Sequence, residues 1–118
     1  MARYVDGFLL VVPRRKLAAY RALARKAGKV WMSYGALDYV ETVIDDPSRY
    51  GKPFAKVAGA KPGEVVVFSW ISYRSRAHRN AVNKKVLADP RMKVPDASDM
   101  PFDMKRISHA GFKALVEF

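Results

Sequence analysis

Residues 65–73 read Val-Val-Val-Phe-Ser-Trp-Ile-Ser-Tyr, the longest run of apolar and β-favouring side chains in the chain. Lys61-Pro62-Gly63 precedes this run and Arg74-Ser75-Arg76 follows it, so turn-forming and charged residues bound it on both sides. β-Branched and aromatic side chains suit the pleated surface of a sheet, and the run therefore predicts a β-strand. Because side chains alternate across a strand, this one presents large apolar groups to both faces, and both faces need a cover.

The segments on either side of this strand alternate between strand and helix patterns. Apolar residues after Pro13 recur at three- and four-residue steps, which predicts a helix, and Ser75 is a suitable N-cap for another. Gly28 costs about 1 kcal/mol inside a helix, so we expect a kink or an early end there. The expected elements are strands over residues 4–12, 36–44, 65–73 and 105–118, helices over 14–35 and 75–88, and irregular stretches over 45–62 and 91–101, with a short helical turn near 48 or 54–57.

This order, β-α-β-β-α-β, predicts an α+β fold of the ferredoxin-like type, in one domain that spans residues 1–118. Its antiparallel sheet carries two helices on one face, which leaves the other face of the apolar strands uncovered. A second copy of the chain is the simplest cover, through an isologous contact. We therefore expect a homodimer that forms through the sheet.

The charge of the chain is strongly unbalanced. Lys and Arg number 22 against 11 Asp and Glu, for a formal net charge of +11. Such a field favours a basic surface without a specific polyanion, and it predicts weak, non-specific association with nucleic acid. There is no cysteine, which excludes disulfides and thiolate sites and fits a reducing cytoplasm, and no stretch has the length of a membrane-spanning helix.

Several short motifs along the chain point to a known family. They are Tyr4-Val5-Asp6-Gly7-Phe8, Gly35-Ala36-Leu37, Val40-Glu41, Val66-Val67-Phe68-Ser69-Trp70-Ile71, Asn83-Lys84-Lys85, Asp89-Pro90-Arg91-Met92, Met100-Pro101-Phe102-Asp103-Met104-Lys105-Arg106 and Gly111-Phe112. Through these motifs the chain resembles the YbaA-like family of small bacterial proteins of unknown function. The resemblance implies the dimeric α/β-barrel superfamily, in which two ferredoxin-like sheets pack face to face. It implies no activity, and no catalytic motif of related branches can be matched here.

The candidate ligand site is an aromatic cleft between the first helix and the sheet. We expect it to be built by Trp31, Tyr34, Phe68 and Trp70, with Phe102 and Met104 from the segment before the last strand. Phe68 and Trp70 belong to this cleft if the even-numbered side chains of residues 65–73 face the helices. Lys105 and Arg106 are expected at the rim, where they can receive an anionic group, and His109 is a further candidate. The alternative is that these aromatic residues simply fill the core.

Other chemistry has weaker support in the sequence. Asp6 and His109 are the best candidates for acid–base work if the first and last strands pair, and a structural hydrogen-bonded pair is the alternative. No ligand spacing joins His78 and His109, so we expect neither a metal nor a cofactor. The sequence leaves open whether the protein is an enzyme. It favours a homodimer that binds a small apolar or anionic molecule, with a nucleic-acid-associated protein and a regulatory dimer without ligand as alternatives.

Overall fold

The computed structural model describes residues 3–93, 96 and 99–118. Part of the stretch that we expected to be irregular, residues 91–101, lies outside this description. The elements in chain order are β1 (Tyr4–Pro13), η1 (Arg14–Lys16), α1 (Leu17–Ser33), β2 (Asp38–Val43), α2 (Phe54–Ala58), β3 (Glu64–Tyr73), α3 (Arg76–Ala88), η2 (Pro90–Met92), η4 (Met104–Arg106) and β4 (Ser108–Lys113). None of the helices in the described part is long and apolar enough to cross a membrane.

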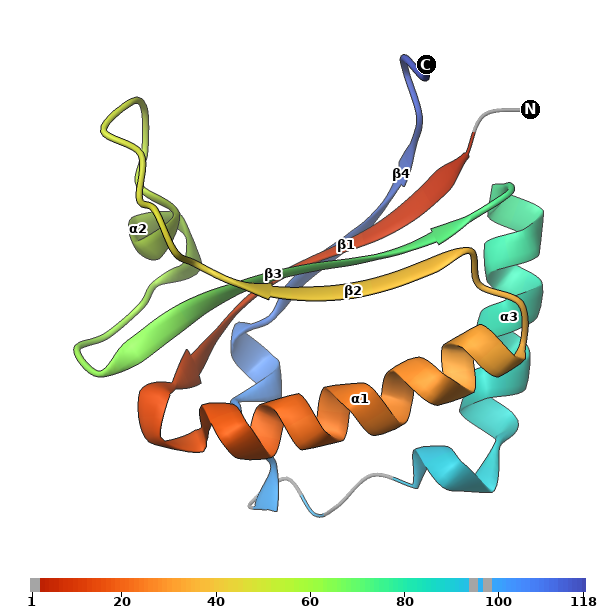
Figure 1. Cartoon of the computed structure of the whole chain (residues 1–118), viewed down its shortest axis with the longest axis horizontal. Helices are drawn as coiled ribbons and strands as arrows, with labels where there is room; N and C mark the ends of the chain where they lie inside the picture. Colours follow the sequence, from red (N-terminus) through yellow and green to blue (C-terminus); the bar gives the residue numbers. More distant parts are fainter. Residues whose placement is uncertain (1–2, 94–95, 97–98) are drawn as a thin grey trace.

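The four strands form one antiparallel sheet in the order β2-β3-β1-β4. The predicted strand of residues 65–73 is a central strand, flanked by β1 and β2, and the last strand pairs with β1 at the edge. Figure 1 shows α1 and α3 on one side of the sheet, and the short α2 on the other side near one end. This confirms the α+β, ferredoxin-like arrangement.

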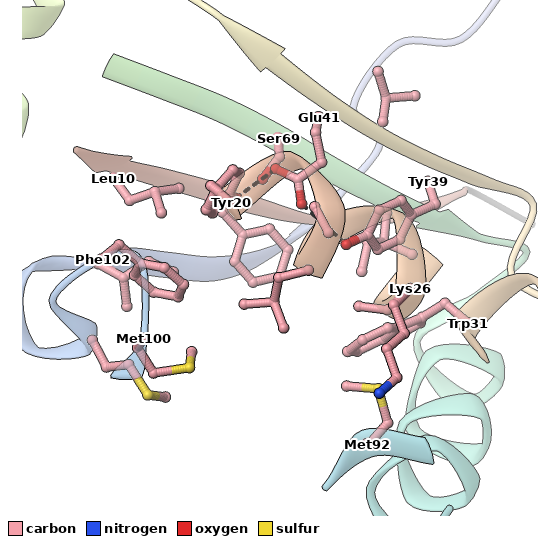
Figure 2. Close-up of a pocket in the computed structure, with 18 of the residues that line it drawn as sticks. Leu10, Tyr20, Lys26, Trp31, Tyr39, Glu41, Ser69, Met92, Met100 and Phe102 are labelled. Atoms are coloured by element: carbon pink, nitrogen blue, oxygen red, sulfur yellow. Dashed lines mark hydrogen bonds between the residues drawn. The ribbon is translucent and has the colours of Figure 1, made fainter. Parts of the chain in front are cut away.

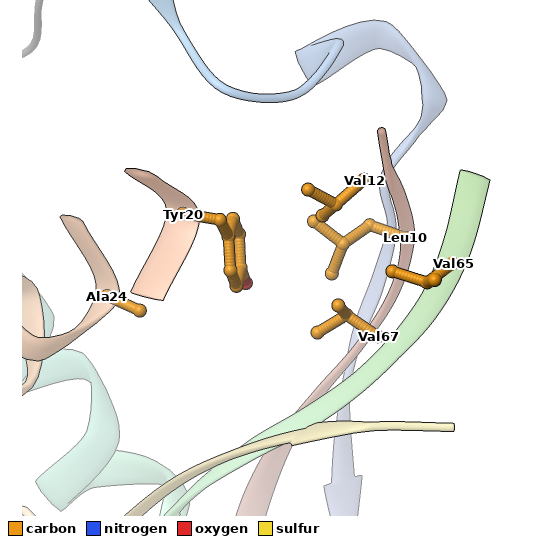
Figure 3. Packing of buried hydrophobic residues seen from close by; sticks show 6 residues of the cluster. All are labelled: Leu10, Val12, Tyr20, Ala24, Val65 and Val67. Atoms are coloured by element: carbon orange, nitrogen blue, oxygen red, sulfur yellow. The ribbon is translucent and has the colours of Figure 1, made fainter. Parts of the chain in front are cut away.

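The helix-covered face of the sheet holds the core in two clusters. In the first, Leu10 and Val67 from neighbouring strands meet Tyr20 from α1, as Figure 3 shows. In the second, Ile71 and Tyr73 pack against residues of α1 and α3. The odd-numbered side chains of β3 therefore face the helices.

The opposite face of the sheet carries the even-numbered side chains of β3. The Phe68 ring stacks on Phe54 of α2 at 6.2 Å and lies 5.7 Å from the Trp70 ring. Phe68 is 44% exposed, and Phe112 at the edge of the same face is 58% exposed. Large apolar side chains thus remain open to solvent on the face that α1 and α3 do not cover.

Several predicted elements differ in their bounds, and the second strand, for example, covers Asp38–Val43 rather than residues 36–44. The last strand covers Ser108–Lys113 rather than residues 105–118. It starts later because the Asp103 side chain accepts the Lys105 backbone N–H at 2.9 Å and caps a 3-10 turn. The first helix runs through Gly28 to Ser33, so the early end expected at this glycine is wrong. Gly28 instead allows the Tyr39 ring to approach, since a Cβ there would lie 2.8 Å from Tyr39 Cδ1.

Candidate ligand cavity

A cavity of about 350 Å³ lies between α1 and the sheet, and η2 and the segment before β4 close its far side (Figure 2). Ala24 and Ala27 of α1 contribute only methyl groups to its wall, which leaves space between helix and strands. Aromatic and thioether side chains are prominent in the remaining wall: Phe8, Tyr20, Trp31, Tyr39, Met92, Met100, Phe102 and Met104. An apolar cavity of this size falls within the range of small-molecule sites.

The polar part of the inner wall is Ser69 and Glu41, and Glu41 is bonded to two tyrosines. The Tyr20 hydroxyl donates to Glu41 Oε1 at 2.7 Å, and the Tyr39 hydroxyl donates to Glu41 Oε2 at 3.0 Å, as Figure 2 shows. Burial, reinforced by the Glu41 carboxylate, raises the pKa of both hydroxyls well above the usual range. Both tyrosines therefore remain hydrogen-bond donors at physiological pH and hold the carboxylate against this wall.

Three cationic residues border the cavity where it opens to solvent, and all three are exposed: Lys26, Arg91 and Lys93. Arg91 is held in place, because its guanidinium donates to Asp89 at 2.8 and 3.0 Å and to Ser33 Oγ at 3.1 Å. The hydrogen bonds from Arg91 to Asp89, together with one from the Tyr34 hydroxyl, hold the pKa of the Asp89 carboxyl far below its usual value. The opening is therefore positively charged, whereas the inner wall carries the Glu41 carboxylate.

Two of the predicted site residues line this cavity with their rings. Trp31 is half-buried, and its indole N–H donates to Asn83 Oδ1 of α3 at 3.0 Å. Phe102 meets the Tyr20 ring edge-on, with 5.5 Å between the ring centroids. Thus α1 and the segment before β4 both contribute aromatic walls, as the sequence predicts.

The structure places the other predicted aromatic residues elsewhere. The interpretation of Phe68 and Trp70 as partners of Trp31 is wrong, because the even-numbered side chains of β3 point away from the helices. Trp70 borders the cavity only as part of the strand, with its ring beside Phe68. Tyr34 packs at the far end of α1, where its hydroxyl donates to Asp89 Oδ2 at 2.7 Å.

The two predicted rim cations also lie away from the cavity. Lys105 is exposed and does not line it. Arg106 pairs with Glu64 at 2.6 Å and donates to the Gly59 carbonyl at 2.7 Å, so its guanidinium fastens η4 to the start of β3. The cations that border the cavity are the three named above.

Asp6 and His109 come together as the pairing of β1 with β4 predicts, with 3.7 Å between His109 Nε2 and Asp6 Oδ1. The His109 ring stacks on Phe8 at 4.6 Å and is partly exposed, whereas Asp6 is 1% exposed. Arg79 of α3 approaches the same carboxylate at 3.3 Å and lies over the Tyr4 ring. This buried ion pair joins α3 to the sheet, and acid–base chemistry at the pair stays a prediction.

The described residues contain no group of three or more His, Asp or Glu side chains that could hold a metal ion.

Comparisons with known proteins agree with this architecture. The family model described as "Protein of unknown function (DUF1428)" matches residues 3–104. The chain belongs to this family. It is 43% identical over 116 residues to the uncharacterized protein YbaA of Escherichia coli K12, with 98% of each chain covered, and equally similar to YbaA of Shigella flexneri.

Solved structures share the fold of this DUF1428 member at low identity. One is described as a dimeric ferredoxin-like protein from an uncultured marine organism, with a TM-score of 0.58, 12% identity and 100% of both chains covered. Another is an uncharacterized NIPSNAP domain protein from Burkholderia xenovorans, with a TM-score of 0.55, 14% identity and 92% and 91% of the two chains covered. At such identities the likeness concerns the fold alone.

Sequence reasoning missed Glu41, Lys26, Met92 and Met100 of the cavity, whereas Met104 was expected beside Phe102 and lines it. The signal for Glu41 was its alternation with Tyr39 and Val43 on one side of β2, which places a carboxylate on the helix-covered face. In the sequence Lys26 is one of several charged residues that occupy the rest of the helix surface. Met92 lies in the single 3-10 turn η2 and Met100 in an irregular segment, where no periodicity predicts the direction of a side chain.

Proposed function

We propose that this DUF1428 member is a single-domain cytoplasmic protein that binds a small molecule with an apolar, flat body and one anionic group. The observation that carries the proposal is the aromatic and methionine-lined cavity between α1 and the sheet. Its volume of about 350 Å³ equals the share of roughly a dozen water molecules, which suits a ligand of about that many non-hydrogen atoms. The cytoplasmic location is in keeping with the cysteine-free sequence.

The distribution of charge supports one orientation of such a ligand. The inner wall carries the Glu41 carboxylate, which repels an anion, and its two tyrosine donors are already engaged with it. Lys26 and Lys93 border the open side of the cavity, where their positive charges attract an anion. The anionic group therefore lies at the opening and the apolar body lies inside, against Trp31 and Phe102.

We also infer that the chain forms a homodimer through the face of the sheet opposite α1 and α3. Phe68 and Phe112 are large, exposed and on this face, and α2 covers only one end of it. A similar fold is described as dimeric in the protein from a marine organism. A second copy with the same apolar face is a self-complementary partner.

A fluorescence titration tests the ligand proposal. We expect one or more aromatic carboxylates in a small-molecule panel to quench Trp31 emission saturably and to raise the melting temperature. At a ligand concentration 100 times the Kd, the stabilisation is about 2.7 kcal/mol. Trp31→Phe removes this signal while Trp70 still emits, which identifies the responding side chain.

Filling the cavity provides the matched variant. Ala27→Phe places a ring in the cavity and should weaken binding at least tenfold, whereas Ala19→Phe, at an exposed position of the same helix, should leave the affinity unchanged. Lys26→Glu should weaken the binding of anionic compounds more than that of their neutral amides. Equal affinity of the Ala27→Phe protein and the wild type would place the ligand elsewhere.

A further inference from the structure

The segment from η1 through α1 carries many cations, of which only Lys26 borders the cavity. Residues 14–33, all of which the structure describes, contain no Asp or Glu. Seven cations occupy them: Arg14, Arg15, Lys16, Arg21, Arg25, Lys26 and Lys29. Their seven positive charges amount to more than half of the net charge of +11, and all lie within one helix and the turn before it.

Three of these cations form a row. Arg21, Arg25 and Lys29 follow four-residue steps, so they lie on one side of α1, about 6 Å apart along its axis. All three are exposed, and they line one wall of a groove of about 700 Å³ between α1 and β2. Tyr39, Glu41 and Val43 of β2 contribute to the other side of this groove. Both Glu41 carboxylate oxygens accept hydrogen bonds from tyrosine hydroxyls, and the three cations outnumber this one carboxylate.

This arrangement opposes the electrostatics of the helix itself. The N-terminus of a helix carries partial positive charge and prefers acidic residues, yet α1 has none in its first turn and begins after Arg14, Arg15 and Lys16. Its N-cap, Lys16, makes no side-chain capping bond. Like charges at four-residue spacing repel as well, by about 0.2–0.5 kcal/mol a pair. Sequences commonly depart from such local rules at functional sites.

We propose that the groove between α1 and β2 binds the phosphodiester backbone of a single-stranded nucleic acid, with Arg21, Arg25 and Lys29 along its phosphates. Binding of this kind relies on a positively charged groove that follows the backbone. The Tyr39 ring in this groove is packed against Gly28 of α1, so the proposal rests on the phosphate contacts of the three cations. The wall residues offer few groups that could read base edges, so the binding is indifferent to sequence. The site lies on the helix side of the sheet and stays accessible whether or not the opposite face is covered.

A membrane surface is the competing partner for a basic helix. Helices that lie on membranes insert an apolar face between the lipids. The apolar side of α1 is instead occupied, because Tyr20, Ala24 and Val30 are buried against the sheet and α3. Only charge is left to attract a lipid surface, whereas for a nucleic acid the cations line a groove that can hold an extended backbone.

Charge reversal with a matched control tests the site. The probes are fluorescently labelled dT12 and rU12, and binding is measured by anisotropy between 50 and 200 mM salt. With three phosphates neutralised, the logarithm of the affinity should fall with that of the salt concentration with a slope of about −2. Arg21→Glu with Arg25→Glu should lower the affinity at least tenfold at 50 mM salt and reduce the slope by about 1.4.

The control is Lys84→Glu with Lys85→Glu, at exposed positions of α3, which changes the net charge by the same amount. It should retain an affinity within threefold of the wild type. The row variant should melt at or above the wild-type temperature, because acids in this half of α1 relieve its like-charge repulsion. Near-ultraviolet circular dichroism checks that both proteins are folded.

Three results would overturn the proposal. One is an equal loss in both double variants, which would mean that net charge alone governs binding. Another is wild-type affinity in the row variant. The third is tighter binding to vesicles with 30% anionic lipid than to either oligonucleotide, lost in the row variant alone.

Discussion

Gly28 is unfavourable for its own helix, and the close approach of the Tyr39 ring from β2 accounts for it. It lies inside α1, where glycine is unfavourable by about 1 kcal/mol relative to alanine. A Cβ at this position would meet the Tyr39 ring at 2.8 and 2.9 Å, closer than ordinary packing allows. The missing side chain lets β2 approach α1, which in turn places the Tyr39 hydroxyl on Glu41 at the cavity wall.

Gly28→Ala should therefore destabilise the protein, although alanine is the better helix former. The clash costs about 1–3 kcal/mol as overpacking, against about 1 kcal/mol gained in helix propensity, so the expected net loss is up to about 2 kcal/mol. Urea denaturation measures it. Ala19→Gly, at an exposed site of the same helix, reports the propensity effect alone. An alanine variant more stable than the wild type would show that Tyr39 moves aside without cost.

Among the elements, the 3-10 turn η4 is joined to the start of β3 by one ion pair. Arg106 donates to both Glu64 carboxylate oxygens, at 2.6 and 2.8 Å, and to the carbonyl of Gly59 at 2.7 Å. The hydrogen bonds from Arg106 to the carboxylate are the main reason why the pKa of Glu64 is lowered to about 2. Since η4 leads directly into β4, the pair helps to position the edge strand and the segment that closes the cavity.

This pair predicts a pH dependence of stability. A carboxyl whose pKa is lower in the folded state stabilises the fold above its unfolded pKa and loses this effect as the pH falls. Arg106→Gln should thus lower the urea midpoint at pH 7, and the difference from wild type should shrink as the pH falls from 4.5 to 2. Lys105→Gln, at the exposed neighbouring position, should change neither the urea midpoint at pH 7 nor its dependence on pH. A difference that stays constant down to pH 2 would refute the linkage to Glu64.

For the whole molecule, the exposed apolar face of the sheet predicts assembly. Sedimentation equilibrium at micromolar concentration should give twice the chain mass of 13.3 kDa. Phe68→Asp places a charge on this face and should give a folded monomer, whereas Leu87→Asp, 78% exposed on α3, should leave the dimer intact. Ile71→Asp should instead damage the monomer core, because Ile71 is 4% exposed beneath the helices. A folded wild-type monomer at this concentration would contradict the dimer.

Local patterns in the sequence were sufficient for the order of elements and for the fold class. The alternation in residues 4–12 and 65–73 and the helical steps after Pro13 depend on neighbours in the chain, so they are readable without a structure. The helical steps also indicated Trp31 as a wall of a cleft beside the sheet, and the place of Phe102 just before the last strand indicated its contribution to the same cleft. Net charge likewise follows from composition, and so does the excess of cations over residues 14–33.

The tertiary structure alone determined which face of the central strand meets the helices. A period of two separates Val67 and Ile71 from Phe68 and Trp70, but both sets are apolar, so hydrophobicity does not choose between them. The partner of Arg106 was equally undetermined, because Glu64 lies 42 positions away in the chain. Packing between distant segments settles both, since the energy of a buried contact depends on proximity in space and leaves no trace in local periodicity.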